Sequence, residues 1–378
     1  MVFLSKYFLD LYFYNNDINI FLMESKGEND TMSKIRLGLI GCGGMMKNHA
    51  KGIEVLDCVE ITAVCDVDIE KAKDVASVLK SPYVTDDYKT MVDHVDAVLV
   101  VLPHHLHFSC GMFFARAKKH ILMEKPLCNT EEECLRLIET CEENGVTLMC
   151  AYPVRYWQGV QKLKEYVDSG DYGKIMQMSI WTEQLTVVDD QHWIGTACVG
   201  GGQLFSHGCH YIDILLWFCG NPVTGSHLGT NVGTPWMLRE GTSVVTMKFE
   251  NGALGYHGAT WGSRGTKLGC NFQIIMEKGL LEYEHFDGEV RLYDALKEHV
   301  PGEAIERGNS YKVLWKRESE VNKETQHEVA HFADCVMNDK KPVTDGRSSL
   351  QSLRVIWKMY DAEKFGVMAD LRGLGIEE

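Results

Sequence analysis

The glycine-rich segment at residues 41–44 and the later Asp66 are the first residues whose spacing indicates chemistry. Gly41 and Gly43 follow the apolar run 35–40 and precede a helix-like segment. Gly41 allows a sharp turn, and Gly43 leaves space where backbone approaches a pyrophosphate, which the free N–H groups of a following helix can bind. Asp66 ends the second apolar run, 25 residues after Gly41, about where a carboxylate accepts hydrogen bonds from an adenosine ribose. These residues predict a dinucleotide site rather than an ordinary glycine turn.

The segment after the glycines departs from this pattern at one position. A third small residue is expected where the helix packs closely on the strand, and that position is Met46. The first two glycines set the geometry of the phosphate site, so the prediction of a dinucleotide site stands. Met46 is expected to alter either the placement of the helix or the affinity for the cofactor. Gly44 and Met45 are also predicted to contact the cofactor.

A dinucleotide site suggests hydride transfer at a carbinol carbon, which also requires a group that takes the hydroxyl proton. Lys125 lies at the end of an apolar run and precedes Pro126. Its charge can hold a hydroxyl and ease the loss of the proton; the alternative is a solvated surface lysine. Asp66, Pro103 and Tyr152 also lie at the ends of apolar runs. Because the carboxyl ends of parallel strands meet at one edge of a sheet, these residues are expected to cluster.

His210 is the second candidate for proton transfer, because the pKa of an imidazole suits exchange near neutral pH. Residues 204–218 predict a helix that places Ser206, His210 and Asp213 on one face. Alternatively, His210 is a buried histidine that Asp213 satisfies. His207 is expected to face away from His210 on this helix, so a metal held by the two histidines is not favoured and no metal site is predicted.

The strands and helices that must position these residues fall into two predicted domains. Both domains combine strands with helices, which predicts an α/β fold. Residues 34–152 alternate short apolar runs with amphipathic segments, as a Rossmann domain with a parallel sheet requires. Its predicted elements include strands at 95–103, 120–123 and 146–151 and a helix at 130–144. Residues 153–378 predict a second α/β domain with an open, largely antiparallel sheet. Its predicted strands are 174–183, 242–249, 253–261, 272–276, 280–284 and 289–293, with helices at 158–169, 324–337 and 348–365.

Composition narrows the class of protein. The 378 residues carry a net charge of −15 without a basic stripe, which argues against nucleic acid and anionic membranes as partners. The 13 cysteines are dispersed and include no C-x-x-C pair, which indicates a reducing cytoplasm rather than disulfides or zinc. Residues 1–33 match neither a signal peptide nor a membrane span. They are interpreted as a non-catalytic extension, with Met32 as the natural start.

Over roughly residues 34–371 the chain resembles the family of glucose–fructose oxidoreductase, inositol dehydrogenase and rhizopine-catabolism proteins. The motifs that carry the resemblance are, in order, the glycine turn, Asp66, Pro103-His104-His105-Leu106-His107, Glu124-Lys125-Pro126, Arg155-Tyr156, Gly200-Gly201-Gly202, Gly208-Cys209-His210-Tyr211-Ile212-Asp213 and Glu277-Lys278-Gly279. The resemblance implies a nicotinamide cofactor and a cyclic polyol or sugar as substrate. It also implies a homodimer or homotetramer built through the outer face of the C-terminal sheet.

The resemblance also assigns roles to single residues. It implies that Lys125 is catalytic, that Glu124 lies beside the cofactor and that His210 is the general acid/base. Further cofactor contacts are expected from Pro103 and His107, and substrate contacts from Arg155, Trp193, Ser206, His207, His210 and Asp213.

The chain departs from the family at Ser206, where relatives commonly have an aspartate. A hydroxyl can bind a sugar but cannot stabilise an imidazolium by charge. Either the substrate differs, or Asp213 or another carboxylate substitutes, or catalysis is weak. The loop with Asp189, Asp190, His192 and Trp193 is either a solvated turn or supplies a carboxylate and an aromatic platform for a sugar.

The sequence therefore predicts a cytoplasmic NAD-dependent oxidoreductase that acts on a ring CH–OH group of a cyclic polyol, sugar or sugar derivative. NAD is preferred over NADP because the carboxylate of Asp66 repels a 2′-phosphate. One alternative is redox-assisted glycoside cleavage or epimerisation with recycled NAD. Another is a catalytically silent, sugar-sensing regulator that keeps the fold.

Overall fold

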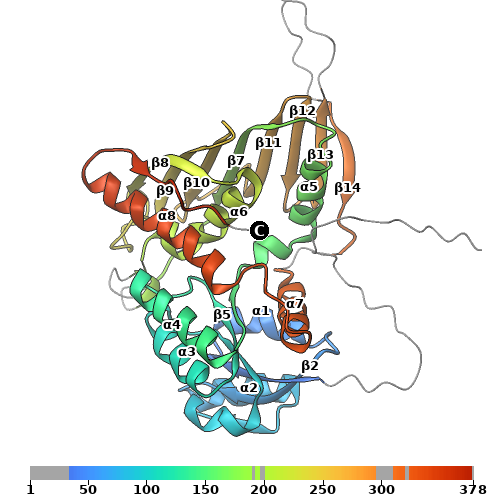
Figure 1. The fold of residues 1–378 in the computed structure, drawn as a ribbon, viewed down its shortest axis with the longest axis vertical. Helices are drawn as coiled ribbons and strands as arrows, with labels where there is room; N and C mark the ends of the chain where they lie inside the picture. Colours follow the sequence, from blue (N-terminus) through green and yellow to red (C-terminus); the bar gives the residue numbers. More distant parts are fainter. Residues whose placement is uncertain (1–33, 190–191, 196–200, 295–309, 320–322, 377–378) are drawn as a thin grey trace, which may run out of the picture. The chain divides into compact units, whose positions relative to one another are not determined.

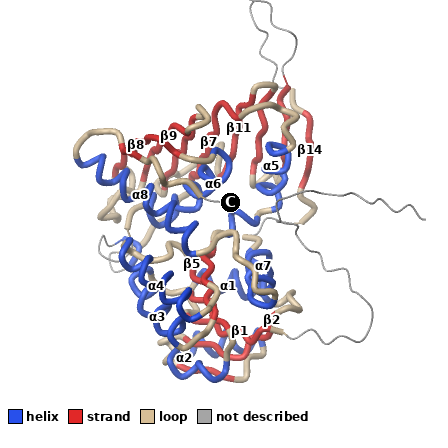
Figure 2. Tube along the Cα trace, viewed as in Figure 1, coloured by secondary structure: helices blue, strands red, loops and turns tan. Residues whose placement is uncertain are grey.

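The computed structural model describes residues 34–189, 192–195, 201–294, 310–319 and 323–376 (Figure 1). The extension predicted at residues 1–33 and Asp190 lie outside the described residues. Two sheets, each accompanied by helices, make up the described chain (Figure 2). The predicted α/β fold class is thereby confirmed. No helix in the described ranges is both long and apolar enough to cross a bilayer.

The first sheet has the strand order of a Rossmann domain. Its strands are β1 (Ile35–Ile40), β2 (Val59–Cys65), β3 (Tyr83–Thr85), β4 (Ala97–Val100), β5 (His120–Glu124) and β6 (Leu148–Ala151). They lie in the order β3-β2-β1-β4-β5-β6, and every neighbouring pair is parallel. The direction of winding reverses between β1 and β4, and a crevice for a ligand forms beyond the carboxyl ends of the strands at such a point.

The helices of this half begin and end at residues that the sequence marks. They are α1 (Gly44–Ile53), α2 (Ile69–Leu79), α3 (His107–Arg116) and α4 (Glu131–Asn144), with short 3₁₀ turns η1 (Tyr88–His94) and η2 (His104–Leu106). The side chain of Thr130 accepts the N–H of Glu133 and caps α4, and Gly145 ends it with φ 65°. The helix predicted at 130–144 is confirmed.

The second sheet is larger and mostly antiparallel. Its strands are β7 (Ile175–Glu183), β8 (Pro222–Thr230), β9 (Thr242–Phe249), β10 (Leu254–Thr260), β11 (Cys270–Met276), β12 (Gly279–Glu284), β13 (Glu289–Asp294), β14 (Lys312–Lys316) and β15 (Ala369–Asp370). Their order is β14-β13-β12-β11-β7-β10-β9-β8-β15, and β7 and β10 form a parallel pair. Strands β8, β14 and β15 were not predicted, because β8 is rich in glycine and polar residues and the other two are short edge strands.

Four helices accompany the second half of the chain. They are α5 (Gln158–Asp168), α6 (Cys209–Cys219), α7 (Thr325–Met337) and α8 (Gly346–Lys364), with short turns η3 (Pro153–Tyr156), η4 (Trp193–Gly195) and η5 (Leu204–Gly208). Helices α5, α6 and α8 contact the second sheet. Helix α7 instead contacts α1 and β5 (Figure 1), so a late segment of the chain completes the packing of the Rossmann sheet.

Met46 shows how α1 packs without a third small residue. Its side chain is fully buried in a cluster that includes Leu39 of β1 and Phe332 of α7. Burial of a side chain of this size stabilises the fold by about 1.5–3 kcal/mol. The helix is therefore retained, with a core methionine in place of a glycine or alanine.

Candidate active site

The turn between β1 and α1 keeps an open space above its backbone. Gly41 has φ +87°, and a Cβ there would lie 2.2 Å from the carbonyl oxygen of Val101. A Cβ built on Gly43 or Gly44 would meet no described atom within 4 Å. Helix α1 begins at Gly44 with no side-chain cap and no acidic residue in its first turn. Its free N–H groups and positive dipole end therefore suit a pyrophosphate.

Asp66 follows β2, and the backbone holds its carboxylate in place. Oδ2 accepts the N–H of Cys42 at 2.6 Å, and Oδ1 accepts the N–H of Asp68 at 2.8 Å. The first bond ties the carboxylate to the glycine turn, so the two parts of the predicted dinucleotide site are neighbours. Each carboxylate oxygen has a further lone pair that can accept a ligand hydroxyl. These residues fit the adenosine and pyrophosphate parts of a dinucleotide.

The loop after β4 contains Pro103 and is anchored by His107. The ring nitrogens of His107 each lie 2.8 Å from a carbonyl oxygen, one of Leu102 and one of Pro126. Burial lowers the pKa of His107, although the two carbonyls and the charge of Glu124 favour its protonated form. His107 was predicted to contact the cofactor. That contact stays a prediction, and the ring nitrogens join the ends of β4 and β5 and so position the loops.

Trp193 lies against this same loop. Its ring centroid is 4.5 Å from that of His104, which directly follows Pro103, and 5.8 Å from that of His192. The aromatic side chain predicted to contact a sugar therefore lies beside the carboxyl end of β4, where the strand-end residues gather.

Glu124 and Lys125 form a charged pair of residues at the end of β5. The Nζ of Lys125 donates to the peptide oxygen of Ser206 at 2.9 Å, which links the two halves of the site. Glu124 is buried; its Oε2 accepts the backbone N–H of Lys125 at 3.1 Å and its Oε1 lies 2.8 Å from Nε2 of His49. Burial acts to raise the pKa of Glu124, but the hydrogen bond and charge of His49 and the charge of Lys125 lower it below its ordinary value. Glu124 is therefore an anion beside a cation.

The helix predicted over residues 204–218 is present, but its first turn is π-helical. The segment η5 is a single π-helical turn, and α6 begins after it at Cys209. His207, predicted to face away from His210, has its ring centroid 6.0 Å from that of His210, because residues three apart on a helix lie side by side. That part of the prediction was wrong.

Residues distant in sequence stabilise this π turn. Oε1 of Glu240 accepts the N–H of Leu204 at 3.1 Å and the hydroxyl of Tyr360 at 2.6 Å. The N–H of Phe205 donates to the same hydroxyl at 3.2 Å. A Cβ on Gly202 would lie 2.0 Å from Oε1 of Glu240, so the glycine leaves room for this carboxylate. Glu240 and Tyr360 were not predicted, because no local sequence signal connects them to the site.

His210 is buried, and its Nδ1 has no hydrogen-bond partner within the described part of the chain. Burial lowers the pKa of His210 well below its ordinary value, and the positive charge of Lys125 lowers it further. The imidazole is therefore neutral near pH 7 and able to accept a proton. The alternative interpretation, a histidine satisfied by Asp213, does not hold, because Asp213 has a different partner.

That partner is Arg155, and the two form a buried ion pair. Nε of Arg155 donates to Oδ2 of Asp213 at 2.5 Å, and Nη2 donates to Oδ1 at 3.0 Å. Burial raises the pKa of Asp213, and the charge and hydrogen bond of Arg155 oppose that rise. Both were predicted to contact substrate. The pair joins η3 to α6 and so positions the helix that carries His210, and a contact of either residue with substrate stays a prediction.

His207 is oriented by a short chain of hydrogen bonds. Ser243 Oγ donates to Oε1 of Gln203 at 2.8 Å, and Nε2 of Gln203 lies 3.3 Å from Nδ1 of His207. Burial and the charge of Lys125 lower the pKa of His207 well below its ordinary value. The site therefore holds two neutral imidazoles near the ammonium groups of Lys125 and Lys323. Across the described ranges, no group of three or more His, Cys, Asp or Glu side chains could hold a metal ion.

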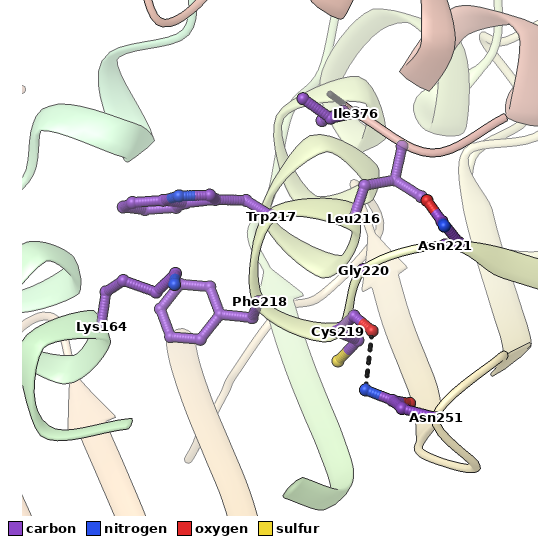
Figure 3. Close-up of a pocket in the computed structure, with 9 residues that line it drawn as sticks. All are labelled: Lys164, Leu216, Trp217, Phe218, Cys219, Gly220, Asn221, Asn251 and Ile376. Atoms are coloured by element: carbon purple, nitrogen blue, oxygen red, sulfur yellow. Dashed lines mark hydrogen bonds between the residues drawn. The ribbon is translucent and has the colours of Figure 1, made fainter. Parts of the chain in front are cut away.

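A separate pocket of about 450 Å³ lies at the C-terminal end of α6 (Figure 3). Trp217 and Phe218 form its walls, and Lys164 pairs with Asp168 at 2.6 Å. The amide of Asn251 donates to the carbonyl oxygen of Cys219 at 3.0 Å (Figure 3). The polar groups of this pocket thus serve the fold, and it contains none of the predicted site residues.

Two sequence profiles match the two halves of the chain. Residues 35–152 match "Oxidoreductase family, NAD-binding Rossmann fold", and residues 160–282 match "GFO/IDH/MocA C-terminal domain". The chain belongs to this oxidoreductase family. The predicted family membership is confirmed, and so is the prediction that the first domain is of the NAD-binding kind.

Individual relatives cover different shares of the chain. An uncharacterised oxidoreductase of Bacillus subtilis is 27% identical over 227 residues, which are 58% of this chain and 65% of that protein. The match thus spans less than two thirds of that relative. The D-xylose 1-dehydrogenase [NADP(+)] of Haloarcula marismortui is 26% identical over 88% of this chain and 92% of its own length. A levoglucosan dehydrogenase in complex with NADH and levoglucosan superposes with a TM-score of 0.78 at 20% identity, covering 89% of this chain and 99% of its own, which shows a shared fold.

Proposed function

We propose that this protein is an NAD-dependent oxidoreductase that transfers a hydride to or from a ring carbinol carbon of a cyclic polyol, sugar or sugar derivative. The observation that carries the proposal is the contact between Lys125 and the π turn. It brings an ammonium group, at the carboxyl end of β5, to the segment that leads into His210. Relatives named for D-xylose and levoglucosan support a sugar-like substrate.

The residues divide the chemistry between them. A bound nicotinamide supplies the hydride acceptor or donor. In the direction of oxidation, Lys125 holds the substrate hydroxyl and stabilises negative charge on its oxygen. The neutral imidazole of His210 takes the hydroxyl proton as the carbon–hydrogen bond breaks. In the direction of reduction, Lys125 polarises the carbonyl oxygen and the protonated His210 returns the proton to it.

Asp66 supports NAD rather than NADP as the cofactor. Its carboxylate is fixed beside the glycine turn, where it would accept hydrogen bonds from a ribose and repel a 2′-phosphate. Because the relative from Haloarcula is named for NADP(+), the preference of this protein for NAD requires a test. Titration of the protein with both cofactors is expected to give tighter binding of NAD, and tighter binding of NADP would contradict the assignment.

The experiment that tests the proposal is a screen for NADH formation. The protein would be incubated with NAD and a panel of inositols, hexoses and glycosides, and NADH absorbance would be followed. Net NADH formed with at least one ring polyol or sugar is the expected result. A tight NAD complex without turnover on any substrate, in either direction, would contradict the proposal.

We also propose that the open face of the second sheet contacts another copy of the chain. Leu228 and Val244 are cross-strand partners on this face, with exposed fractions of 70% and 37%, and Leu254 of β10 is 50% exposed. Leu254 pairs with Lys248, four residues along β9 from Val244, so the three side chains lie apart on one face. Exposed apolar side chains on one sheet face can mark an interaction surface. Light scattering is expected to give a dimer or tetramer that the double change Leu228→Glu, Val244→Glu disrupts; a monomeric parent would contradict this.

A further inference from the structure

Three titratable side chains lie buried behind Lys125, and the proposed hydride transfer uses none of them directly. His49 comes from α1, Glu124 from the end of β5 and Glu328 from α7. Their exposed fractions are 0%, 4% and 0%. Buried ionisable groups are costly unless they are paired, so each requires a partner.

The hydrogen bonds among them are unequal. Both oxygens of Glu124 are engaged, one by Nε2 of His49 at 2.8 Å and one by the backbone N–H of Lys125 at 3.1 Å. Nδ1 of His49 lies 3.9 Å from Oε1 of Glu328, about 1 Å beyond hydrogen-bond length. Among the described residues, neither Nδ1 of His49 nor either oxygen of Glu328 has a hydrogen-bond partner. These unpartnered atoms face one another.

The hydrogen bonds restrict where the protons of His49 and the two glutamates can lie. Glu124 is an anion, so Nε2 of His49 must carry a hydrogen to donate to it. With a proton on Nδ1, His49 would be an imidazolium between two buried carboxylates, and all three side chains would be charged. With Nδ1 bare, an ionised Glu328 would be a second buried anion without a donor. A single proton on Glu328 removes that charge and supplies Nδ1 with a donor.

The charges around Glu328 favour this state. Burial raises the pKa of Glu328 well above its ordinary value, and the negative charge of Glu124 raises it further. Lys323, which precedes α7, opposes the rise. Tyr156 of η3 also lies near Glu328, and because burial raises the pKa of its hydroxyl, it adds no charge.

We propose that Glu328 is protonated and offers its hydrogen to Nδ1 of His49, which fixes His49 as the tautomer that holds Glu124 as an anion behind Lys125. His49 and Glu328 are then positioning residues for the active site. This inference rests on the proposed dehydrogenase function for its effect on turnover, whereas the protonation of Glu328 is independent of that function.

Glu328→Gln and Glu328→Leu distinguish a neutral donor from an anion. The glutamine amide keeps a neutral donor to Nδ1, so kcat is expected to stay within about twofold of the parent. Leucine removes the donor, and kcat is expected to fall about tenfold with little change in KM. Equal losses in both variants would show that Glu328 acts as an anion and would overturn the proposal.

The melting temperature measured against pH tests the proton without any substrate. An unfolded glutamate ionises near about pH 4.3, whereas the folded Glu328 keeps its proton to higher pH. At this one group the folded state therefore binds more protons above that pH, so Glu328 lowers the stability of the parent as pH rises. Glu328→Gln removes this loss, so its melting temperature relative to the parent is expected to rise between about pH 5 and pH 8.

Glu143→Gln, a change at an exposed position of α4, is the matched control for the loss of one glutamate. It is expected to show no such rise. A difference between Glu328→Gln and the parent that stays constant or reverses with pH would overturn the proposal. Failure of the substrate screen together with the expected pH dependence would overturn the proposed enzymatic function and leave the protonated Glu328 in place.

Discussion

The glycine turn before α1 and the π turn before α6 each present a helix start to the same strand-end region, but they are built in opposite ways. The glycine turn consists of backbone and open space: no described atom lies within 4 Å of where a Cβ on Gly43 or Gly44 would be. The π turn is filled, because the carboxylate of Glu240 occupies the space where a Cβ of Gly202 would lie. One turn leaves room for a ligand, and the other uses its room to orient His207 and His210.

The difference teaches that a glycine can serve two purposes. At Gly43 the missing side chain would admit the phosphate of the proposed cofactor, so glycine would be required there for binding. At Gly202 the missing side chain makes room for the carboxylate of Glu240, so glycine is required there for folding. Changes in the first turn should therefore alter binding, and changes in the second should alter stability and the geometry of catalysis.

Lys125 connects the two regions, and its loss is expected to have the largest effect. Lys125→Ala removes the charge that would stabilise the substrate oxygen, so turnover is expected to fall by about two orders of magnitude. NAD affinity and melting temperature should stay close to those of the parent. Kinetics with NAD and an active sugar would measure this, with Lys89→Ala, a change at an exposed lysine, as control. Turnover near that of the parent would remove Lys125 from the mechanism.

The pair Gly202→Ala and Gly43→Ala tests the comparison itself. Gly202→Ala forces its methyl group against Glu240 and is expected to lower the free energy of unfolding by about 1–3 kcal/mol. Gly43→Ala meets no described atom, and its φ of −73° suits alanine, so stability should be unchanged while NAD binding weakens. Thermal unfolding and NAD titration of both variants give the answer. If Gly43→Ala destabilised the fold and left NAD binding intact, the distinction between the two turns would fail.

Ser206→Asp sharpens the account of the π turn. Ser206 is buried, and its peptide oxygen already binds Lys125. An added carboxylate would be desolvated, so turnover on the natural substrate is expected to decrease. Its charge should also raise the pKa of His210 and move the acid limb of the pH–rate profile to higher pH. Unchanged kinetics and an unchanged profile would place Ser206 outside the site.

Asp66→Ala is expected to have the smallest effect, and it acts on the open region alone. Loss of the carboxylate removes a repulsion from the 2′-phosphate of NADP and a hydrogen-bond acceptor for the ribose of NAD. The ratio of the two dissociation constants should move toward one by about tenfold, the equivalent of about 1.4 kcal/mol. A preference for NAD as strong as that of the parent would show that other residues select the cofactor.

The sequence predicts the Rossmann half well because its signals are local. The strand ends at Asp66 and Lys125 and the helix at 130–144 are read from neighbouring residues, and all three are where the pattern places them. The π turn could not be predicted, because Glu240 and Tyr360 stabilise it from distant parts of the chain. The contact between His49 and Glu328 depends in the same way on the packing of α7 against α1.

The most direct test of the central claim follows the hydrogen itself. A substrate found active in the screen would be deuterated at its ring carbinol carbon, converted with NAD, and the nicotinamide product examined by NMR or mass spectrometry. We predict that the deuterium appears on the nicotinamide ring of NADH, one atom for each substrate molecule oxidised. Deuterium found in water, with none on the cofactor, would contradict hydride transfer from the ring carbon and with it the proposed function.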